Sequence, residues 1–230
     1  MNLISFNVLI QLLRDRKSFL SEIERNKNLE YKIISLLFSS SLFFALYGAI
    51  IGSLHGWLQM ISSAFKLPAL YLLTLLICLP TLYFLDIIFG SKKTFIQYIA
   101  LLLASMSLIS VMLFGFSPVS LFFRLTVNDY YFFQLLNIGI FALTGFIGIK
   151  FFYEAMLSLI AGSEVDVSLQ NRRKLIKSWL VLYGFVGSQL GWTLRPFFGV
   201  PGQPFALYRE LESNFYIQVM KIVSNVFGLN

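Results

Sequence analysis

Charged residues are scarce in this chain of 230 residues. They make up 13% of it, whereas soluble domains contain about a quarter. Hydrophobic residues make up 57%, and the mean hydropathy is +0.77. The 25 Phe, 11 Tyr and 3 Trp exclude a disordered or low-complexity chain. A soluble surface cannot be built from this composition, which instead indicates an integral membrane protein.

Residues that carry chemistry are equally scarce. Cys78 is the single cysteine, so the chain can form neither an intrachain disulfide nor a thiolate metal cluster. His55 is the single histidine, which leaves it without a second ligand or a catalytic triad. The motifs HExxH, GxSxG, GxxxxGK[ST] and GxGxxG are missing, and so are paired carboxylates. We therefore predict a protein that is not an enzyme, with no catalytic residue, no metal and no cofactor.

Long apolar runs take the place of these motifs. A helix needs about 20 apolar residues to cross a bilayer. Five stretches fit this requirement: 33–54, 67–89, 95–116, 130–160 and 178–194. They lack the alternation of membrane strands. The predicted fold is an all-α integral membrane bundle of about five transmembrane helices over residues 33–194.

The distribution of lysine and arginine predicts an orientation, because these residues are enriched in cytoplasmic flanks. One side has twelve of the 18 basic residues, namely Arg14, Arg16, Lys17, Arg25, Lys27, Lys32, Lys92, Lys93, Arg172, Arg173, Lys174 and Lys177. The other side has Lys66, Arg124, Arg195, Arg209 and Lys221. We expect a cytoplasmic N-terminus and an outer C-terminus. The net charge of +7 then marks the cytoplasmic face and gives no reason to expect a nucleic-acid partner.

Both ends of the chain are predicted to be amphipathic. In the cytoplasmic segment 1–32, one helical face over 3–24 carries Leu9, Leu12, Leu13, Phe19, Leu20 and Ile23. An interfacial helix on the cytoplasmic leaflet is the favoured interpretation, and packing on the bundle or on a partner chain is the alternative. The outer tail, 195–230, starts with a turn rich in Pro and Gly and continues in a second helical stripe. That stripe contains Tyr208, Leu211, Phe215, Val219, Ile222 and Val226.

Two GxxxG motifs predict close helix packing inside the membrane. They are Gly48 with Gly52 in the first span and Gly187 with Gly191 in the fifth. Small residues one turn apart allow two helix backbones to approach closely. Because both motifs fall toward the outer half, we expect these two helices to cross there. Trp179 and Trp192 bracket the fifth span as expected interface anchors.

A few polar residues fall at membrane depth, where ionisable groups are candidates for function. Asp86 lies at the end of the second span and could pair with Lys92, Lys93 or Lys150. Lys150 and Glu154 are one helical turn apart and could pair with each other. Together with Gln189, these groups could either form ion pairs and hydrogen bonds near the interface or line a polar path.

A block of the outer tail carries a resemblance. Trp192, Arg195, Pro196, Phe197 and Gly199 form the pattern W-x-L-R-P-F-x-G. With the Pro- and Leu-rich run 67–83, this block resembles a family of uncharacterised bacterial multispan proteins, cyanobacterial ones among them. That family is more distantly similar to the five-span Yip-domain proteins. The resemblance implies a multispan fold and no activity.

These features favour a scaffold, assembly factor or subunit of a larger membrane complex. Its expected partners are the lipid bilayer and either other membrane subunits or further copies of itself. The alternative is a channel or transporter subunit with a polar path near Asp86, Lys150, Glu154 and Gln189. A lipid-binding or lipid-modifying protein is the third and weakest hypothesis, because the sequence offers no catalytic groups for it.

Overall fold

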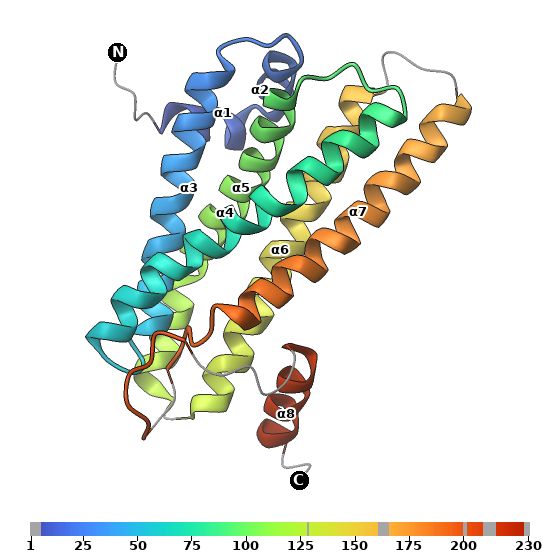
Figure 1. Cartoon of the computed structure of the whole chain (residues 1–230). Helices are drawn as coiled ribbons and strands as arrows, with labels where there is room; N and C mark the ends of the chain where they lie inside the picture. Colours follow the sequence, from blue (N-terminus) through green and yellow to red (C-terminus); the bar gives the residue numbers. More distant parts are fainter. Residues whose placement is uncertain (1–5, 128, 161–165, 200–201, 209–214, 228–230) are drawn as a thin grey trace.

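The computed structural model describes residues 6–127, 129–160, 166–199, 202–208 and 215–227. Every regular element within these ranges is a helix (Figure 1). The elements are α1 (Asn7–Arg14), α2 (Arg16–Glu24), α3 (Leu29–Gly52), α4 (Trp57–Ile88), α5 (Phe95–Thr126), α6 (Tyr130–Ile160), α7 (Asp166–Thr193) and α8 (Phe215–Phe227). The predicted all-α class is therefore confirmed.

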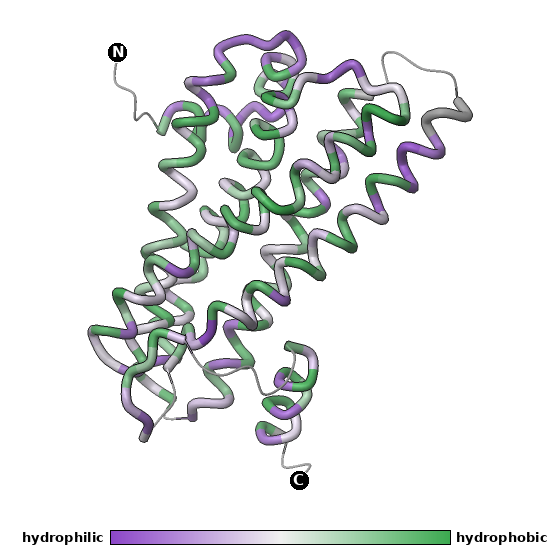
Figure 2. Tube along the Cα trace, in the orientation of Figure 1, coloured by the Kyte–Doolittle hydropathy of each residue, from purple (hydrophilic) through white to green (hydrophobic). Residues whose placement is uncertain are grey.

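Four of these helices are long and apolar enough to cross a membrane: α3, α4, α5 and α6. Their hydrophobic side chains include both buried and exposed ones. Hydrophobic residues predominate along their traces (Figure 2). Such a distribution is typical of helices surrounded by lipid, since lipid tails do not select against exposed apolar side chains. α5 contacts α1, α2, α3, α4 and α6, and its residues 100–110 are all buried. A helix, rather than a space, therefore occupies the middle of the bundle.

α4 differs most from its predicted span. It begins at Trp57 rather than at residue 67 and continues through Pro68 and Pro80 to Ile88. Lys66, which was expected in an outer loop, lies inside this helix and is only 5% exposed. The apolar run marked only the later part of α4, residues 67–88. The preceding turns, residues 57–66, carry polar side chains on one face, and Gln59, Ser63 and Lys66 bind another segment of the chain.

α7 contains the predicted fifth span but starts twelve residues before it, at Asp166. It packs beside α4, and the two helices run diagonally across the bundle in Figure 1. The first half of α7 is polar, with Arg173, Lys174 and Lys177 exposed. α7 is consequently not among the four helices whose composition alone qualifies them as membrane spans.

Two short helices replace the single amphipathic helix expected over 3–24, of which residues 3–5 lie outside the described residues. The break falls at Asp15, whose side chain accepts a hydrogen bond from Ser18 N–H at 3.0 Å and so caps α2. Phe19 and Ile23 are fully buried, and α1 and α2 pack on α3, α5 and α6. Of the two arrangements that the sequence left open, the structure has the one in which this segment docks on the bundle.

The segment after α7 crosses the lower end of the bundle in Figure 1, toward the connection between α3 and α4. α8 lies at the same end and packs on α6 and α7. In the predicted amphipathic stripe, Ile222 is buried and Val219 is half-buried. Arg209 and Leu211, to which the sequence gave a place in the outer tail, lie outside the described residues.

Candidate functional site

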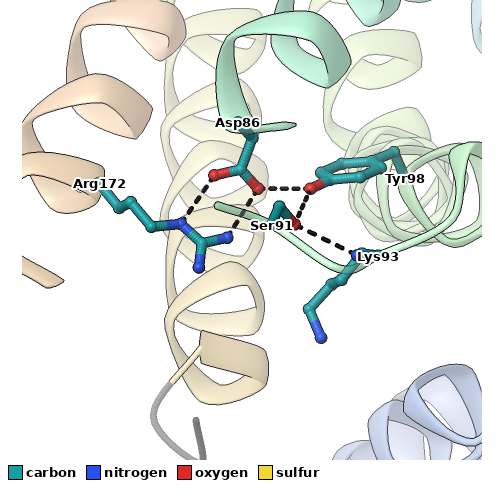
Figure 3. A network of polar contacts seen from close by, with 5 residues as sticks. All are labelled: Asp86, Ser91, Lys93, Tyr98 and Arg172. Atoms are coloured by element: carbon teal, nitrogen blue, oxygen red, sulfur yellow. Dashed lines mark hydrogen bonds and ion pairs between the residues drawn. The ribbon is translucent and has the colours of Figure 1, made fainter. Parts of the chain in front are cut away.

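Asp86 forms a fully buried ion pair with Arg172 of α7 (Figure 3). Arg172 Nε donates to Asp86 Oδ1, and its Nη2 donates to Oδ2, each at 2.9 Å. Asp86 is 0% exposed and Arg172 is 2% exposed. This two-point contact fixes both groups in one plane and is among the stronger hydrogen-bonded arrangements in proteins. The sequence-based partners Lys92, Lys93 and Lys150 are therefore wrong, because the fold brings a residue 86 positions away to the carboxylate.

The end of α4 positions this carboxylate. Gly90 adopts a left-handed conformation with φ +91°, and its N–H donates to the Ile87 carbonyl at 2.8 Å. The Ser91 N–H then donates to the Asp86 carbonyl at 3.0 Å. These two bonds form the usual glycine-terminated helix end, and they turn the chain back over the last turn of α4. Ser91 is thereby placed beside the Asp86 side chain.

A chain of hydroxyl groups completes the network. Tyr98, in the first turn of α5, donates its hydroxyl proton to Asp86 Oδ2. Ser91 Oγ lies 2.7 Å from the Tyr98 hydroxyl and must be the donor there, since the phenol has a single proton. Lys93 N–H donates in turn to Ser91 Oγ at 3.3 Å. Three elements, α4, α5 and α7, are thus joined through one carboxylate.

The charges of Asp86 and Arg172 neutralise each other within the network. Burial lowers the pKa of the Lys93 ammonium, with the charge of Arg172 acting in the same direction and those of Glu24 and Asp86 opposing it. A buried carboxylate without a cation would be very costly, and Arg172 removes that cost. The arrangement therefore serves to hold α7 against α4 and α5, and its groups are engaged with one another rather than directed at a ligand.

The other candidate polar residues do not converge on Asp86. Lys150 and Glu154 pair with each other at 3.9 Å on α6, as their spacing predicted, but their side chains are 66% and 60% exposed. Gln189 is half-buried on α7. Among the described residues, no hydrogen bond or ion pair links these three to Asp86. The continuous polar path that the sequence allowed is not formed by these four side chains.

A second polar centre lies at the opposite end of α4. Gln59, Ser63 and Lys66 follow one face of this helix at intervals of four and three residues. Gln59 Nε2 donates to the Pro196 carbonyl at 2.7 Å, and Ser63 Oγ donates to the Phe197 carbonyl at 2.5 Å. Lys66 Nζ donates to the Pro196 carbonyl at 3.3 Å and also to the carbonyl of Leu207. We call residues 195–199 and 202–208 the docked tail.

The W-x-L-R-P-F-x-G block, which runs from the end of α7 into the docked tail, makes several of these contacts. The Tyr130 hydroxyl of α6 donates to the Gly199 carbonyl. Gly199 has φ +72°, and a Cβ there would overlap the His55 side chain, so only glycine fits both the conformation and the space. The Arg195 guanidinium stacks over the Trp192 ring at 3.5 Å from its centroid. Pro196 is buried, and Phe197 is half-buried against the core.

His55 also belongs to this centre. Its Nε2 lies 2.8 Å from the Gln203 carbonyl. Gln59, Ser63 and Lys66 hold the docked tail, and the sequence did not predict this role for any of them. Their common helical face was a usable signal, but it lay outside the apolar run that defined the second span.

Both GxxxG motifs face α4. The expected crossing of α3 with α7 at these motifs is therefore wrong, because each of the two helices packs its motif against α4 instead. A Cβ at Gly48 would overlap the Ser63 carbonyl, and one at Gly52 would lie 2.5 Å from the Gln59 carbonyl oxygen. At Gly187 the nearest atom would be Thr74 Cγ2 at 3.6 Å, and at Gly191 it would be Leu70 at 3.9 Å. Only the first motif therefore mediates a close backbone approach.

Two further polar features lie in the core. Tyr47, Ser120 and Asn137 form a buried hydrogen-bond cluster between α3, α5 and α6, in which the Tyr47 hydroxyl donates to Asn137 Oδ1 at 2.6 Å. Trp179, an expected interface anchor, is instead 2% exposed and donates to the Cys78 carbonyl at 3.1 Å. Both features fix contacts between helices, and neither had a sequence motif.

Within the described residues, His, Cys, Asp and Glu form no group of three that could hold a metal ion. No protein-family model, no curated protein and no solved structure matches the chain. The site geometry alone therefore supports the functional argument.

Proposed function

We propose that this protein is a non-enzymatic integral membrane protein that acts as a scaffold, assembly factor or subunit of a larger membrane complex. The observation that carries the proposal is the burial of α5 along residues 100–110. A channel or carrier needs polar groups around a passage, whereas here a helix fills the centre of the bundle. The serines on this helix support the same conclusion. Ser105 and Ser110 donate to carbonyls of α5 itself, and Ser107 donates to the Leu36 carbonyl of α3.

The topology proposed with this function has α7 as a fifth crossing. Its apolar part, 178–193, packs beside α4, while its exposed basic residues lie at the end of the bundle where α1 and α2 dock. The Asp86–Arg172 pair would neutralise one of the charges that make α7 less apolar than the other long helices. With five crossings, the enrichment of Lys and Arg at this end would make it the cytoplasmic face and put α8 on the outer side. A bacterial plasma membrane or thylakoid, and membership of the Yip-like multispan family, remain predictions.

The outer face offers the proposed contact with another subunit or a second copy. α8 buries Ile222 against the bundle but leaves Ile217 46% exposed and Met220 73% exposed. The docked tail next to it is fixed by the hydrogen bonds to α4. A rigid outer segment followed by an amphipathic helix suits a subunit that presents a preformed surface.

Site-specific cross-linking tests this proposal directly. Cys78 is buried, so Met220→Cys would provide the accessible thiol for a photoactivatable cross-linker in native membranes. We expect a discrete adduct with one partner or with a second copy, and a stoichiometric complex after purification in mild detergent. Phe65→Cys is the matched control, because Phe65 of α4 is 75% exposed. It should give lipid adducts only.

Two results would contradict the proposal. One is a lone monomer with no adduct from Met220→Cys. The other is flux of ions or small solutes into proteoliposomes above the background of empty vesicles. The second result would instead support the channel or transporter alternative.

A further inference from the structure

A cavity of about 540 Å³ lies at the end of the bundle where α1 and α2 dock. It is bounded by the connection between α2 and α3, the first turns of α3, and the start of α5. The lining residues are Asn26, Asn28, Leu29, Glu30, Tyr31, Ile34, Thr94 and Ile96. This volume falls in the range of small-molecule and cofactor sites. None of these residues takes part in the Asp86 network or in binding the docked tail.

Hydrogen bonds hold the walls of this cavity together. Gln97, which is 4% exposed, donates to the carbonyls of Ile23 at 2.9 Å and Glu24 at 3.1 Å. Its Oε1 accepts from Thr94 N–H at 2.9 Å. The same side chain therefore ties the end of α2 to the start of α5. The cavity is a preformed feature of the fold, because its opposite sides are connected through a buried amide.

The lining changes from polar to apolar along the helix axes. Asn26, Asn28, Glu30 and Thr94 form the polar part, whereas Ile34 and Ile96 are apolar and about 44% and 43% exposed. Ile34 follows Glu30 by four residues, which is about 6 Å along a helix. Figure 2 shows the same change, with hydrophilic colours over the connection between α2 and α3 and hydrophobic colours along α3 below it. In the proposed topology, this change in the lining would place the cavity where lipid headgroups give way to acyl chains.

The charge in the cavity is negative. Glu30 is the one charged lining residue, and it forms no ion pair with any residue that the structure describes. Asn26, Asn28, Tyr31 and Thr94 add neutral hydrogen-bonding groups. Glu30, Asn26, Asn28 and Thr94 are exposed and therefore accessible from the open side of the cavity. An accessible carboxylate beside such groups favours a ligand that donates hydrogen bonds and carries positive charge.

We propose that this cavity binds a phospholipid whose headgroup carries a primary ammonium, as in phosphatidylethanolamine. The ammonium would donate to the Glu30 carboxylate and the side-chain oxygens of Asn26 and Asn28. The acyl chains would pass over Ile34 and Ile96. Lys27, exposed between the two asparagines, stands next to the expected position of the lipid phosphate.

The lysines and arginines at this end of the protein make anionic lipid the competing ligand. They attract an anionic leaflet over the whole face, without a pocket. A headgroup that is only anionic would meet repulsion from Glu30 inside the cavity. The ligand favoured by the lining is therefore zwitterionic with an N–H donor, and the methylated ammonium of phosphatidylcholine lacks that donor.

Lipid exchange followed by native mass spectrometry tests the proposal on the full-length protein. The purified protein is titrated with phosphatidylethanolamine, phosphatidylcholine and phosphatidylglycerol of identical acyl chains. We expect phosphatidylethanolamine to bind at least fivefold more tightly than phosphatidylcholine. Glu30→Gln should abolish this preference, whereas Glu154→Gln, which changes an exposed acid on α6, should leave it intact. Ile96→Trp should fill the apolar part and weaken the binding of all three lipids.

Thermal melting of each variant, compared with wild type, identifies any that fail to fold, and Ile96→Trp provides a second readout that does not depend on Glu30. Equal affinity of the wild type for phosphatidylethanolamine and phosphatidylcholine would overturn the proposal. So would a dominant preference for phosphatidylglycerol, or a fivefold preference that survives Glu30→Gln. Glycerophosphoethanolamine without acyl chains should bind far more weakly, since it cannot contact Ile34 and Ile96.

Discussion

Arg172 donates two parallel hydrogen bonds of 2.9 Å to Asp86, across a contact buried from solvent on both sides. This contact couples the least apolar long helix, α7, to the end of α4. Both partners are desolvated, so the net contribution of the pair to the free energy of unfolding is small. Removing only one partner is costly, because the other charge is then buried without compensation.

Removing one partner should therefore destabilise the protein strongly. We expect Asp86→Asn to cost about 3–5 kcal/mol, because it leaves the Arg172 charge buried without compensation. The double variant Asp86→Leu with Arg172→Met should recover much of this loss. Thermal unfolding in detergent measures both, with Glu154→Gln as the control for an acid in an exposed pair. A double variant less stable than Asp86→Asn would show that the pair itself stabilises the fold.

The two GxxxG motifs should respond differently to the same substitution. Gly48→Ala should cost about 1–3 kcal/mol or more, since the new methyl group would overlap the Ser63 carbonyl, which cannot move without shifting α4. Gly187→Ala should be nearly neutral, because its methyl group would sit 3.6 Å from a Thr74 side chain. Melting temperatures of the two variants, compared in the same detergent, check this. Equal losses at both positions would be incompatible with the packing described.

The docked tail should loosen when its donors are lost. Lys66→Met keeps the length of the side chain but removes the donor to the Pro196 and Leu207 carbonyls. A hydrogen bond from a charged group contributes about 1.5–3 kcal/mol, which corresponds to at least tenfold faster exchange of the tail amides. Hydrogen–deuterium exchange over residues 196–208 measures this effect. Lys150→Met, at an exposed lysine, is the control, and unchanged tail exchange in Lys66→Met would argue that these hydrogen bonds do not hold the docked tail.

The packing of α2 on α3 should weaken in acid. The Lys32 ammonium holds the pKa of the Glu22 carboxyl below its ordinary value of 4.5, with Gln11 contributing a second hydrogen bond. Because the folded state lowers this pKa, the contribution is fully present above about pH 4.5 and is lost as the pH falls through the folded-state value. The advantage of wild type over Glu22→Gln in melting temperature should therefore be constant from pH 7 to 5 and shrink below that. A constant difference down to pH 3 would contradict this assignment.

The sequence was informative where local physics decides. Apolar runs located the four helices that are long and apolar enough to cross a membrane, and the spacing of Lys150 and Glu154 predicted their pairing. The pattern around Arg195, Pro196 and Gly199 indicated an ordered tail. The sequence was misleading where a polar group is explained only by a distant partner. From the sequence, Lys66 was expected in a loop, because a lysine inside a membrane helix needs a compensating contact and none was evident nearby in the chain. That contact, the carbonyls of the docked tail, is 130 residues away for Pro196 and 141 for Leu207.

Partners of buried polar groups are hard to infer from sequence for a physical reason. In lipid, the free energy of burying Asp86 depends on one cation at hydrogen-bonding distance, and several basic residues were candidates. Arg172 was counted among the cytoplasmic charges, since nothing near it in the chain marks it as buried. The same holds for the crossing of the GxxxG helices, because small residues permit a close approach without specifying the neighbour.

The shortage of charge was enough to predict an integral membrane protein with helical apolar runs, since each run must form a helix to satisfy its own backbone in lipid. Helix formation is local, so composition and run length sufficed for it. Only the tertiary structure decided which helix fills the middle of the bundle, which cation neutralises Asp86 and where the tail docks. Those outcomes depend on side chains far apart in the chain that become neighbours only when the helices pack.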